Sequence, residues 1–364
     1  MGKKILLIVD NKIPELGSGK ILQKKMLSFH GLGFYYYLAE RLDSEGIDYI
    51  TLDLYKNRVR EYNDYKRFVI SYECSHKDIS YYKKNKIVMF MSYSGESPIN
   101  SLKYHKNINK ISAHFHCIYG FIGVSKLLIN KSNFRTFYWP MNIKYYSKKK
   151  FEDRFLLAYI ASAKSKFPYS PRYRFTYYYR KPRYYVNWLI KKRYLGYGKD
   201  ISNYRFEYIR KLATSKEFYL FGKGWTKVLK EDRFFKSIEF ANIPEEVDDK
   251  GCKLQNFKFT LCFENTLFPG YITEKIFDAM LAGSVPVYVG CNNITQEVPS
   301  ECFINVNDFS SPESLLEYLR SMDKNDWELI YSRIIAYIVS EEFKNKYSAK
   351  LFAEELYCEL KKII

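Results

Sequence analysis

Residues 257–290 read FKFTLCFENTLFPGYITEKIFDAMLAGSVPVYVG, and this stretch decides the fold. The apolar run 257–263 is typical of a buried strand. Thr273 is a suitable N-cap for a helix over 273–282, because apolar residues recur there at helical spacing. A second apolar run, 285–289, follows a glycine and predicts another strand. A strand, a helix and a second strand in this order are the unit from which parallel α/β sheets are built.

The polar residues of this stretch gather where the strand ends and the helix begins. Glu264 and Asn265 follow the strand directly, and Glu274 and Lys275 stand in the first helical turn. Free N–H groups and the positive end of the helix dipole make such a place an anion site. A lysine is disfavoured there by the dipole. Its presence is easier to explain if a phosphate lies beside it, the alternative being an ordinary solvated Glu274–Lys275 pair.

The same alternation of short apolar strands and helical stretches extends in both directions. Before residue 150 the predicted strands are Ile5–Val9, Tyr49–Leu54, Arg67–Tyr72, Ile87–Met91, Phe115–Gly120 and Phe134–Trp139, with a helix over Gly31–Glu45. After it they are Phe155–Ser162, Phe218–Phe221, Phe257–Phe263, Val285–Val289 and Phe303–Val306, with a further helix over Pro312–Met322. Two such series predict an α/β protein with two Rossmann-like domains that face each other across a cleft, where ligands bind at the carboxyl ends of strands.

We therefore expect three parts. Residues 1–150 form an N-terminal Rossmann-like domain, residues 151–345 form a C-terminal one, and residues 346–364 form a C-terminal helix. Pro140 and the lysine run 148–150 mark the boundary between the first two.

The composition is that of a globular chain with an uneven charge. Of 364 residues 47% are hydrophobic, and the net charge is +19. Residues 1–230 carry 45 Lys and Arg against 17 Asp and Glu, whereas residues 231–364 carry 14 against 23. This asymmetry favours an anionic partner for the first part: a membrane surface, nucleic acid or an acidic substrate. The seven cysteines are scattered without a C-x-x-C pair, so we expect reduced and mostly buried thiols.

One segment, about 164–200, fits neither domain and is treated as an insertion into the second. From Lys164 to Lys199 it holds eleven Lys or Arg, twelve aromatic residues and no acidic residue. Such a mixture binds nucleic acid by stacking, or lies at a membrane interface. It can also simply cover a domain face. No RRM, KH or zinc-finger signature accompanies it, which makes nucleic-acid binding the least favoured of these.

The motifs of the second half resemble those of a known family. The string FEN, the run 271–275 (YITEK) and the pattern Gly283-x-Val-Pro-Val-x-x-Gly290 are similar to the donor-binding signature of glycosyltransferase family 10, the α-1,3/4-fucosyltransferases. The arginine-containing stretch 205–212 before FGKGW (221–225), and FINVNDF (303–309), also resemble family elements. In the first half, Glu96-Ser97-Pro98 is similar to the E-S-P element.

This resemblance implies a GT-B-type enzyme that transfers fucose from GDP-fucose with inversion of the anomeric carbon. It implies Glu96 as the general base, and Arg205 and Lys275 as the groups that stabilise the leaving diphosphate. It further implies donor contacts from Lys223, Asn265, Tyr271, Thr273 and Glu274. Because the insertion precedes it, Arg205 can be misaligned, and the alternative contact to the diphosphate is Arg210 or an arginine inside the insertion.

We expect no metal and no cofactor besides the donor, since no Asp-x-Asp occurs and cationic side chains can neutralise a diphosphate. The resemblance implies a glycan acceptor, such as a lipid-linked surface-glycan precursor, with O3 of an N-acetylglucosamine or glucose unit as the attacked hydroxyl. No leader or membrane span is evident, so we expect a cytoplasmic enzyme, peripheral at the inner face of the membrane. The alternatives are a transferase of the same fold that uses another nucleotide sugar and, less favoured, a basic nucleic-acid-binding protein.

Overall fold

The computed structural model describes residues 3–29, 31–146, 149–162, 198–225, 241–242 and 245–364. Most of the predicted insertion, residues 164–197, lies outside the described residues. The chain divides into two compact units. Unit 1 comprises Met1–Ile143 with Glu341–Ile364, and unit 2 comprises Lys144–Ser340.

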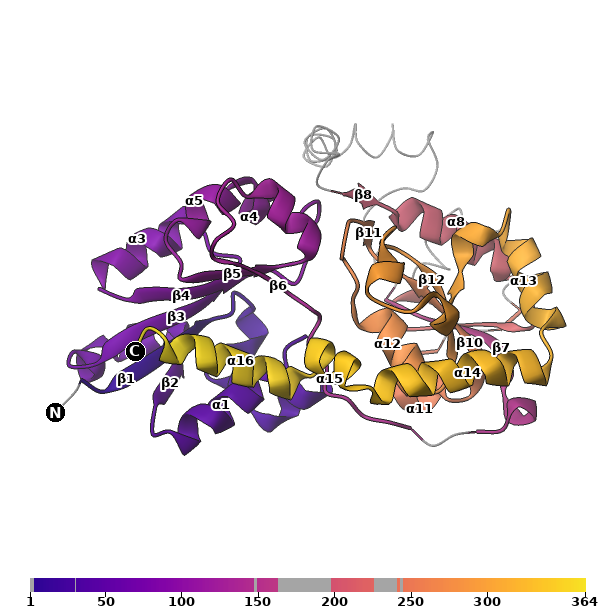
Figure 1. Ribbon diagram of the computed structural model, residues 1–364, viewed down its shortest axis with the longest axis horizontal. Coiled ribbons are helices and arrows are strands. Elements are labelled where there is room, and N and C mark those ends of the chain that lie inside the picture. Colours follow the sequence, from indigo (N-terminus) through magenta and orange to yellow (C-terminus); the bar gives the residue numbers. More distant parts are fainter. Residues whose placement is uncertain (1–2, 30, 147–148, 163–197, 226–240, 243–244) are drawn as a thin grey trace. The chain divides into compact units, whose positions relative to one another are not determined.

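Unit 1 is built on a six-stranded sheet in the order β2-β1-β3-β4-β5-β6, and every pairing in it is parallel (Figure 1). Its strands are β1 (Ile5–Asp10), β2 (Asp48–Thr51), β3 (Lys66–Tyr72), β4 (Val88–Tyr93), β5 (Cys117–Gly120) and β6 (Phe134–Thr136). The central strands are almost completely buried, because a parallel sheet is covered on both faces.

Helices cover both faces of this sheet. They are α1 (Phe34–Ser44), α2 (Leu52–Asn57), α3 (His76–Lys84), α4 (Leu102–Lys106), α5 (Ile108–Ser112), α15 (Glu341–Tyr347) and α16 (Ala349–Lys361). Figure 1 shows α3, α4 and α5 on one side, and α1 and α16 on the other. Helix α3 begins with a capping box, in which Ser75 and Asp78 satisfy each other's backbone N–H groups.

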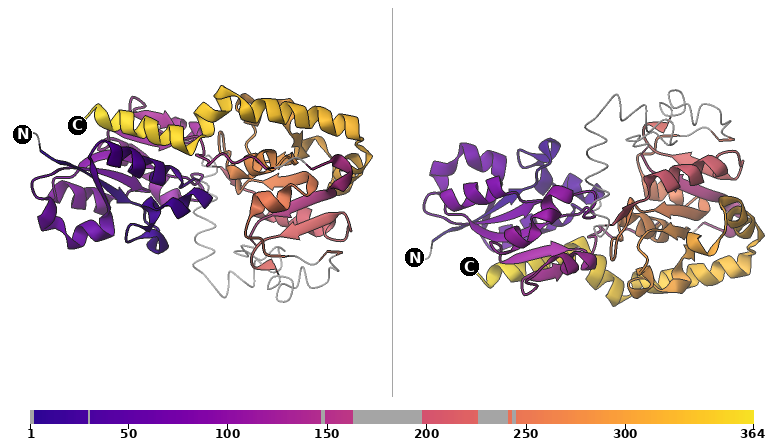
Figure 2. Two further views of the ribbon diagram at one scale, coloured as in Figure 1. Left: turned by 90° about the horizontal axis from the view of Figure 1, so that it is seen from below. Right: turned by 90° about the horizontal axis from the view of Figure 1, so that it is seen from above.

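The C-terminal helix α16 belongs to the core of unit 1, and Figure 2 shows it in yellow against this unit from two further directions. Its Phe352 ring lies 5.0 Å from that of Phe34 and 5.3 Å from that of Tyr119, centroid to centroid. The start of α16 is bound to the segment that follows β6, because the N–H of Ala349 donates to the carbonyl of Met141 at 2.8 Å. Unit 1 is therefore closed by residues from both ends of the sequence.

Unit 2 is built on a five-stranded parallel sheet in the order β13-β12-β10-β7-β9. Its strands are β7 (Phe155–Ile160), β9 (Phe218–Phe221), β10 (Phe257–Phe263), β12 (Val285–Val289) and β13 (Ile304–Asn305). A separate antiparallel pair joins β8 (Lys199–Asp200) to β11 (Thr266–Leu267). The strand order reverses at β7, so the switch point of the sheet lies between β7 and β10, where open α/β sheets bind ligands.

Helices also cover both faces of the second sheet. They are α8 (Ser202–Leu212), α11 (Lys250–Leu254), α12 (Glu274–Leu281), α13 (Pro312–Ser321) and α14 (Lys324–Val339). Figure 1 shows α8 and α13 on one side, and α11, α12 and α14 on the other. The α12 side is held to the sheet by the fully buried Trp327 of α14, whose Nε1 donates to the carbonyl of Lys258 at 2.9 Å.

The predicted α/β class with two parallel sheets is confirmed, and most predicted elements are present. The strand predicted at Tyr49–Leu54 is wrong in its second half, because β2 ends at Thr51 and α2 begins at Leu52. The apolar residues Leu52 and Leu54 do not continue the strand: one buried turn of helix places Leu52 and Tyr55 on the core side. Thr273 is the N-cap of α12, and its predicted apolar face, Ile276, Phe277 and Met280, is fully buried.

All seven cysteines are free thiols, and five of them are buried, as predicted. Across the described part of the chain, each helix is too short or too polar to cross a bilayer.

Replacing Phe352 by Ala removes the aromatic contact that seats α16. We expect the free energy of unfolding of unit 1 to fall by about 3–5 kcal/mol, the usual cost of emptying a buried phenylalanine site. Denaturant titration followed by circular dichroism measures this. The control is Leu351→Ala on the same helix, where the side chain is 40% exposed and the expected change is small. Equal effects of the two substitutions would contradict the placement of α16 in the core.

Candidate functional site

A cavity of about 340 Å³ opens in unit 2 at the carboxyl ends of β7, β9 and β10. It is therefore located at the switch point of the sheet, as the topology leads one to expect. Five of the seven residues for which sequence reasoning expected donor contacts line it: Arg205, Lys223, Asn265, Glu274 and Lys275. They come from one helix, one turn, one strand end and the first turn of α12, so only folding brings them together.

The cationic side of this cavity is supplied by α8 and the turn after β9. Arg205 on α8 is 7% exposed, and its Nη1 donates to Asn265 Oδ1 at 3.4 Å. Lys223 follows Gly222, whose φ of +122° is accessible to glycine and strained for other residues. A side chain at Gly222 would also overlap the backbone of Ala161 at the end of β7.

The structure separates Arg205 from Arg210, whereas the arginines of the insertion lie outside the described residues. Arg205 lines the cavity. Arg210 is not among the cavity residues, and its Nη2 lies 3.3 Å from the carboxylate of Glu207, one turn earlier on α8. Of the two, Arg205 is placed to meet a ligand in the cavity.

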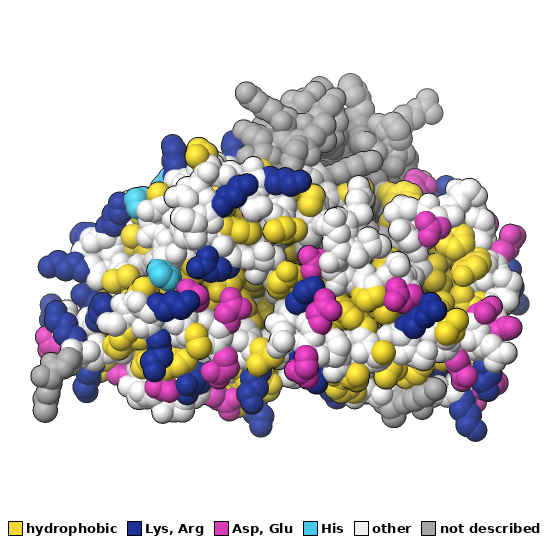
Figure 3. Space-filling view, viewed as in Figure 1, with side chains coloured by type: hydrophobic (Ala, Val, Ile, Leu, Met, Phe, Trp, Pro, Cys, Tyr) yellow, Lys and Arg dark blue, Asp and Glu magenta, His cyan; other side chains and the backbone are white. Residues whose placement is uncertain are grey.

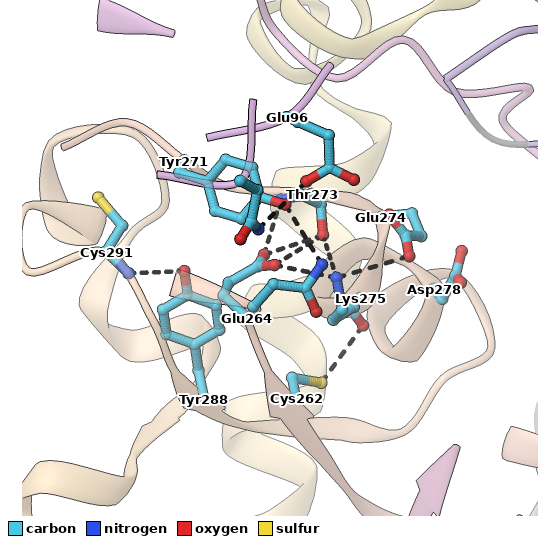
Figure 4. Close-up of polar contacts among 12 residues, drawn as sticks. Glu96, Cys262, Glu264, Tyr271, Thr273, Glu274, Lys275, Asp278, Tyr288 and Cys291 are labelled. Atoms are coloured by element: carbon cyan, nitrogen blue, oxygen red, sulfur yellow. Dashed lines mark hydrogen bonds and ion pairs between the residues drawn. The ribbon is translucent and has the colours of Figure 1, made fainter. Parts of the chain in front are cut away.

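Beneath the cavity, a fully buried carboxylate organises the start of α12 (Figure 4). Glu264, the residue that follows β10, accepts hydrogen bonds from the backbone N–H of Thr273 at 2.7 Å and from its hydroxyl at 2.8 Å. The Nζ of Lys275 lies 3.0 Å from the same carboxylate and 2.8 Å from the Thr273 hydroxyl. The negative group at the N-terminus of α12 is thus a side chain of the protein itself.

This network changes the interpretation of Lys275. Its position at the positive end of a helix, for which a bound phosphate was the expected reason, is already accounted for by Glu264. Glu274 lies 3.7 Å from the same ammonium group, so the two residues do pair, but both side chains are mostly buried and the pair is not an ordinary solvated one. Lys275 nevertheless lines the cavity with 20% of its side chain exposed.

The pKa values follow from burial and from this pairing. Burial raises the pKa of Glu264 above its ordinary value, although the ion pair with Lys275 opposes the shift. Burial by itself would lower the pKa of Lys275, but the carboxylates of Glu264 and Glu274 outweigh it and raise that pKa. Lys275 is therefore charged at neutral pH and offers a fixed positive charge to the cavity.

Space for the buried carboxylate depends on a glycine. A Cβ atom on Gly290 would lie 2.6 Å from Cγ of Glu264 and would overlap the hydroxyl of Tyr288. That hydroxyl accepts a hydrogen bond from the N–H of Cys291 at 3.1 Å. The last glycine of the 283–290 pattern is thus explained by close approach to Glu264.

Tyr271 and Thr273 do not line the cavity. Tyr271 is 1% exposed, and its hydroxyl accepts a long hydrogen bond, 3.5 Å, from Nδ2 of Asn265. Thr273 is also 1% exposed and is bound to Glu264. In this structure both residues support the residues that reach the cavity.

Glu96 belongs to unit 1, where it follows the carboxyl end of β4. It is partly buried, its backbone N–H donates to Ser94 Oγ at 3.1 Å, and Asn100 Nδ2 donates to its carboxylate at 3.3 Å. The Ser94 hydroxyl donates in turn to Glu73 at 2.8 Å. The residue that the resemblance implies as a base is thus held at a strand end, and Ser94 links its backbone to Glu73, a carboxylate that sequence reasoning missed.

Sequence reasoning assigned no role to Glu264, Lys250 or Asp278. Glu264 stands in the FEN string, directly after an apolar strand. A carboxylate at the end of a buried strand is the feature of the sequence that could have indicated its role. Lys250 and Asp278 both line the cavity. Among the described residues no group of three His, Cys, Asp or Glu side chains lies close enough to hold a metal ion.

The comparisons with known proteins agree with the motifs. Residues 191–361 match the family model described as glycosyltransferase family 10 (fucosyltransferase), C-terminal. A curated relative is the 4-galactosyl-N-acetylglucosaminide 3-alpha-L-fucosyltransferase 9 of Mus musculus, 34% identical over 124 residues. That match spans 34% of this chain and only 30% of the mouse protein.

Solved structures share the fold. A crystal structure of an alpha1,3-fucosyltransferase with GDP superposes with a TM-score of 0.51 and 16% identity, over 100% of this chain and 90% of that one. Anabaena Alr3699/HepE in complex with UDP and glucose gives a TM-score of 0.59 and 10% identity, over 99% and 100%. These two structures contain different nucleotides, GDP and UDP, so the shared fold does not decide which nucleotide base this chain would bind.

Replacing Lys275 by Met leaves the Glu264 carboxylate buried without its cation. We expect the free energy of unfolding to fall by about 3–5 kcal/mol at pH 8. Because burial already raises the pKa of Glu264, the folded variant takes up a proton more readily than the unfolded chain. The loss of unfolding free energy relative to wild type is therefore smallest near the ordinary glutamate pKa of about 4.3. It grows as the pH rises through the raised pKa of Glu264 in the folded variant.

Denaturant titrations of variant and wild type at pH 5 and pH 8 measure this difference. Lys211→Met is the matched control, since Lys211 is 45% exposed and lies 3.8 Å from Glu313. If Lys275→Met lost no unfolding free energy relative to wild type, or lost the same amount at both pH values, the buried pair would be contradicted.

The segment that matches the family model includes β10, α12, β12 and Arg205, and so contains the whole network around Glu264. Within residues 191–361, the chain thus matches the C-terminal model of glycosyltransferase family 10.

Proposed function

We propose that this protein transfers fucose from GDP-fucose to a hydroxyl group of a glycan acceptor, with inversion at the anomeric carbon. The observation that carries the proposal is the cavity of unit 2, which collects Arg205, Lys223, Asn265, Glu274 and Lys275 at a sheet switch point. The match of residues 191–361 to the fucosyltransferase family model supports it independently.

The cavity has the charges that a departing nucleoside diphosphate needs. Arg205, Lys223 and Lys275 supply positive groups in a recess with partly apolar walls, where electrostatic stabilisation is stronger than in water. Glu274 supplies a carboxylate that can accept hydrogen bonds from the hydroxyls of ribose or fucose. Asn265, held by Arg205, supplies an amide.

In the proposed reaction Glu96 is the general base. Its carboxylate takes the proton of the acceptor hydroxyl, whose oxygen forms a bond to the anomeric carbon of fucose. The bond from that carbon to the diphosphate oxygen breaks on the opposite face, and its electron pair leaves with GDP. The hydrogen bond from Asn100 orients the Glu96 carboxylate for this task, and the backbone N–H of Glu96 donates to Ser94 Oγ, which fixes the main chain there.

We further propose that no metal or other cofactor takes part, and that the acceptor is a surface-glycan precursor, attacked at O3 of an N-acetylglucosamine or glucose unit. A cytoplasmic enzyme at the inner membrane face would meet such a precursor on its lipid. The basic surface supports an anionic partner of this kind: residues 101–150 carry ten Lys or Arg and no acidic residue. Figure 3 shows dark-blue side chains over the α4 and α5 side of unit 1. Nucleic acid remains the less favoured partner.

The donor is tested by thermal shift and transfer assays with GDP-fucose, GDP-mannose and UDP-glucose. We expect stabilisation and turnover with GDP-fucose, because a ligand that binds only the folded state raises its stability. Arg205→Ala should weaken GDP binding by about 1.5–3 kcal/mol, the range for a hydrogen bond to a charged group. Arg210→Ala is the matched control on the same helix and should bind GDP as wild type does.

Stabilisation by UDP-glucose alone would replace the fucose donor by another nucleotide sugar. Loss of GDP binding in Arg210→Ala, with Arg205→Ala unaffected, would reverse the assignment of the two arginines.

Replacing Glu96 by Gln keeps the size and the hydrogen bonds of the side chain and removes its capacity to accept a proton. We expect transfer to fall by at least a hundredfold, in keeping with the about 10²–10⁴-fold contribution of a general base. GDP affinity, measured by calorimetry, should stay within about twofold of wild type, because the donor cavity lies in unit 2. Wild-type turnover in this variant would remove Glu96 from the mechanism.

A further inference from the structure

Two successive turns of α12 contribute to the lining of the cavity in unit 2. Glu274 and Lys275 stand in the first turn and line the cavity together with Arg205 and Asn265. Asp278 stands one turn later, where the Nζ of Lys250 on α11 lies 3.5 Å from its carboxylate. Figure 4 shows Glu274 and Asp278 following one another along the helix.

Part of the cavity lining is apolar. Leu254 of α11 and Ala282, which follows α12, belong to one buried cluster, against which Ile160 and Val247 pack. Ile160, Val247 and Leu254 all line the cavity. An apolar slot with one carboxylate and one ammonium group at its edge suits a flat ring that has a polar rim.

The cavity therefore offers two kinds of lining. Its cations suit a diphosphate, and its apolar side chains suit the faces of a base. The Asp278 side chain is 8% exposed, so its hydrogen bonds form in a largely dehydrated place, where they discriminate strongly between ligands.

We propose that Asp278 and Lys250 form the base subsite of the donor cavity and select guanine. This inference rests on the proposed function, because it assumes that a nucleoside diphosphate occupies the cavity. The rim of guanine presents an acceptor, O6, followed by two donors, N1–H and the 2-amino group. The Lys250 ammonium donates to O6, and the two oxygens of Asp278 accept from N1–H and the amino group.

Other bases do not match this pair. Uracil presents acceptor, donor and acceptor, so its O2 carbonyl would face an oxygen of Asp278. Adenine places its amino group toward Lys250 and its N1 acceptor toward Asp278, so that donor meets donor and acceptor meets acceptor. A site built to hydrogen-bond a ligand group rejects analogues that lack it far better than an apolar pocket does.

The test compares calorimetric dissociation constants for GDP, UDP and inosine diphosphate, which is GDP without the 2-amino group. We expect wild type to bind GDP about tenfold to a hundredfold more tightly than inosine diphosphate, and UDP more weakly than GDP. Asp278→Asn should reduce GDP affinity and bring the GDP-to-inosine-diphosphate ratio within about threefold. Arg205→Ala should weaken both purine nucleotides equally and keep the wild-type ratio, because Arg205 is assigned to the diphosphate.

Glu317→Gln is the control for loss of a negative charge, because Glu317 is exposed on α13. This variant should have the wild-type dissociation constants for all three nucleotides. Lys250→Met is the second variant, on the 45% exposed lysine, in case Asp278→Asn does not fold. This substitution should weaken the binding of GDP and of inosine diphosphate equally, since both bases carry O6.

The outcomes separate the two proposals. If wild type binds neither GDP nor inosine diphosphate, the proposed donor fails and this inference fails with it. If wild type binds GDP and Asp278→Asn keeps the wild-type ratio, or if wild type does not distinguish the two purine nucleotides, this inference alone is overturned. In Lys250→Met, unchanged affinity for both purine nucleotides would remove Lys250 from the subsite.

Discussion

A single buried carboxylate constrains unit 2 of this protein. Glu264 is fully excluded from solvent, and a charge in such a place is tolerated only when ion pairs and hydrogen bonds compensate it. Lys275 and the N-cap of α12 provide that compensation, and Gly290 leaves the room for it. The end of β10, the start of α12 and the end of β12 are thereby fixed to one point. This arrangement explains the motif in the sequence, because its residues Thr273, Lys275 and Gly290 lie around Glu264.

The fold could be predicted from the sequence because its strands are short, apolar and regularly spaced. The prediction failed where two kinds of pattern meet, as at Leu52, where an apolar residue after β2 begins a helix. The interpretation of Lys275 was incomplete for a different reason. Helix-dipole reasoning identifies an unfavourable charge, but not the nearby buried side chain that neutralises it.

The cavity residues were predictable only in part. Those in the motif, such as Asn265 and Glu274, could be named through the family resemblance. Arg205 could be separated from Arg210 only by the face of α8 that each occupies. Lys250 lies on a five-residue helix without a periodic pattern, so nothing in the sequence pairs it with Asp278 on another helix. Contacts between elements that are far apart in the chain are the part that pattern reasoning cannot supply.

The path of the chain has a practical consequence for dissecting the molecule. The polypeptide leaves unit 1 after Ile143 and returns to it at Glu341. The outgoing and returning segments meet at Met141, which bonds to the backbone on both sides of Ser348. Unit 2 is thus one uninterrupted insert, and residues 144–340 define it for separate expression. A simple truncation cannot yield unit 1, because it would discard α16, whereas a short linker from Ile143 to Glu341 would retain the helix and bypass the insert.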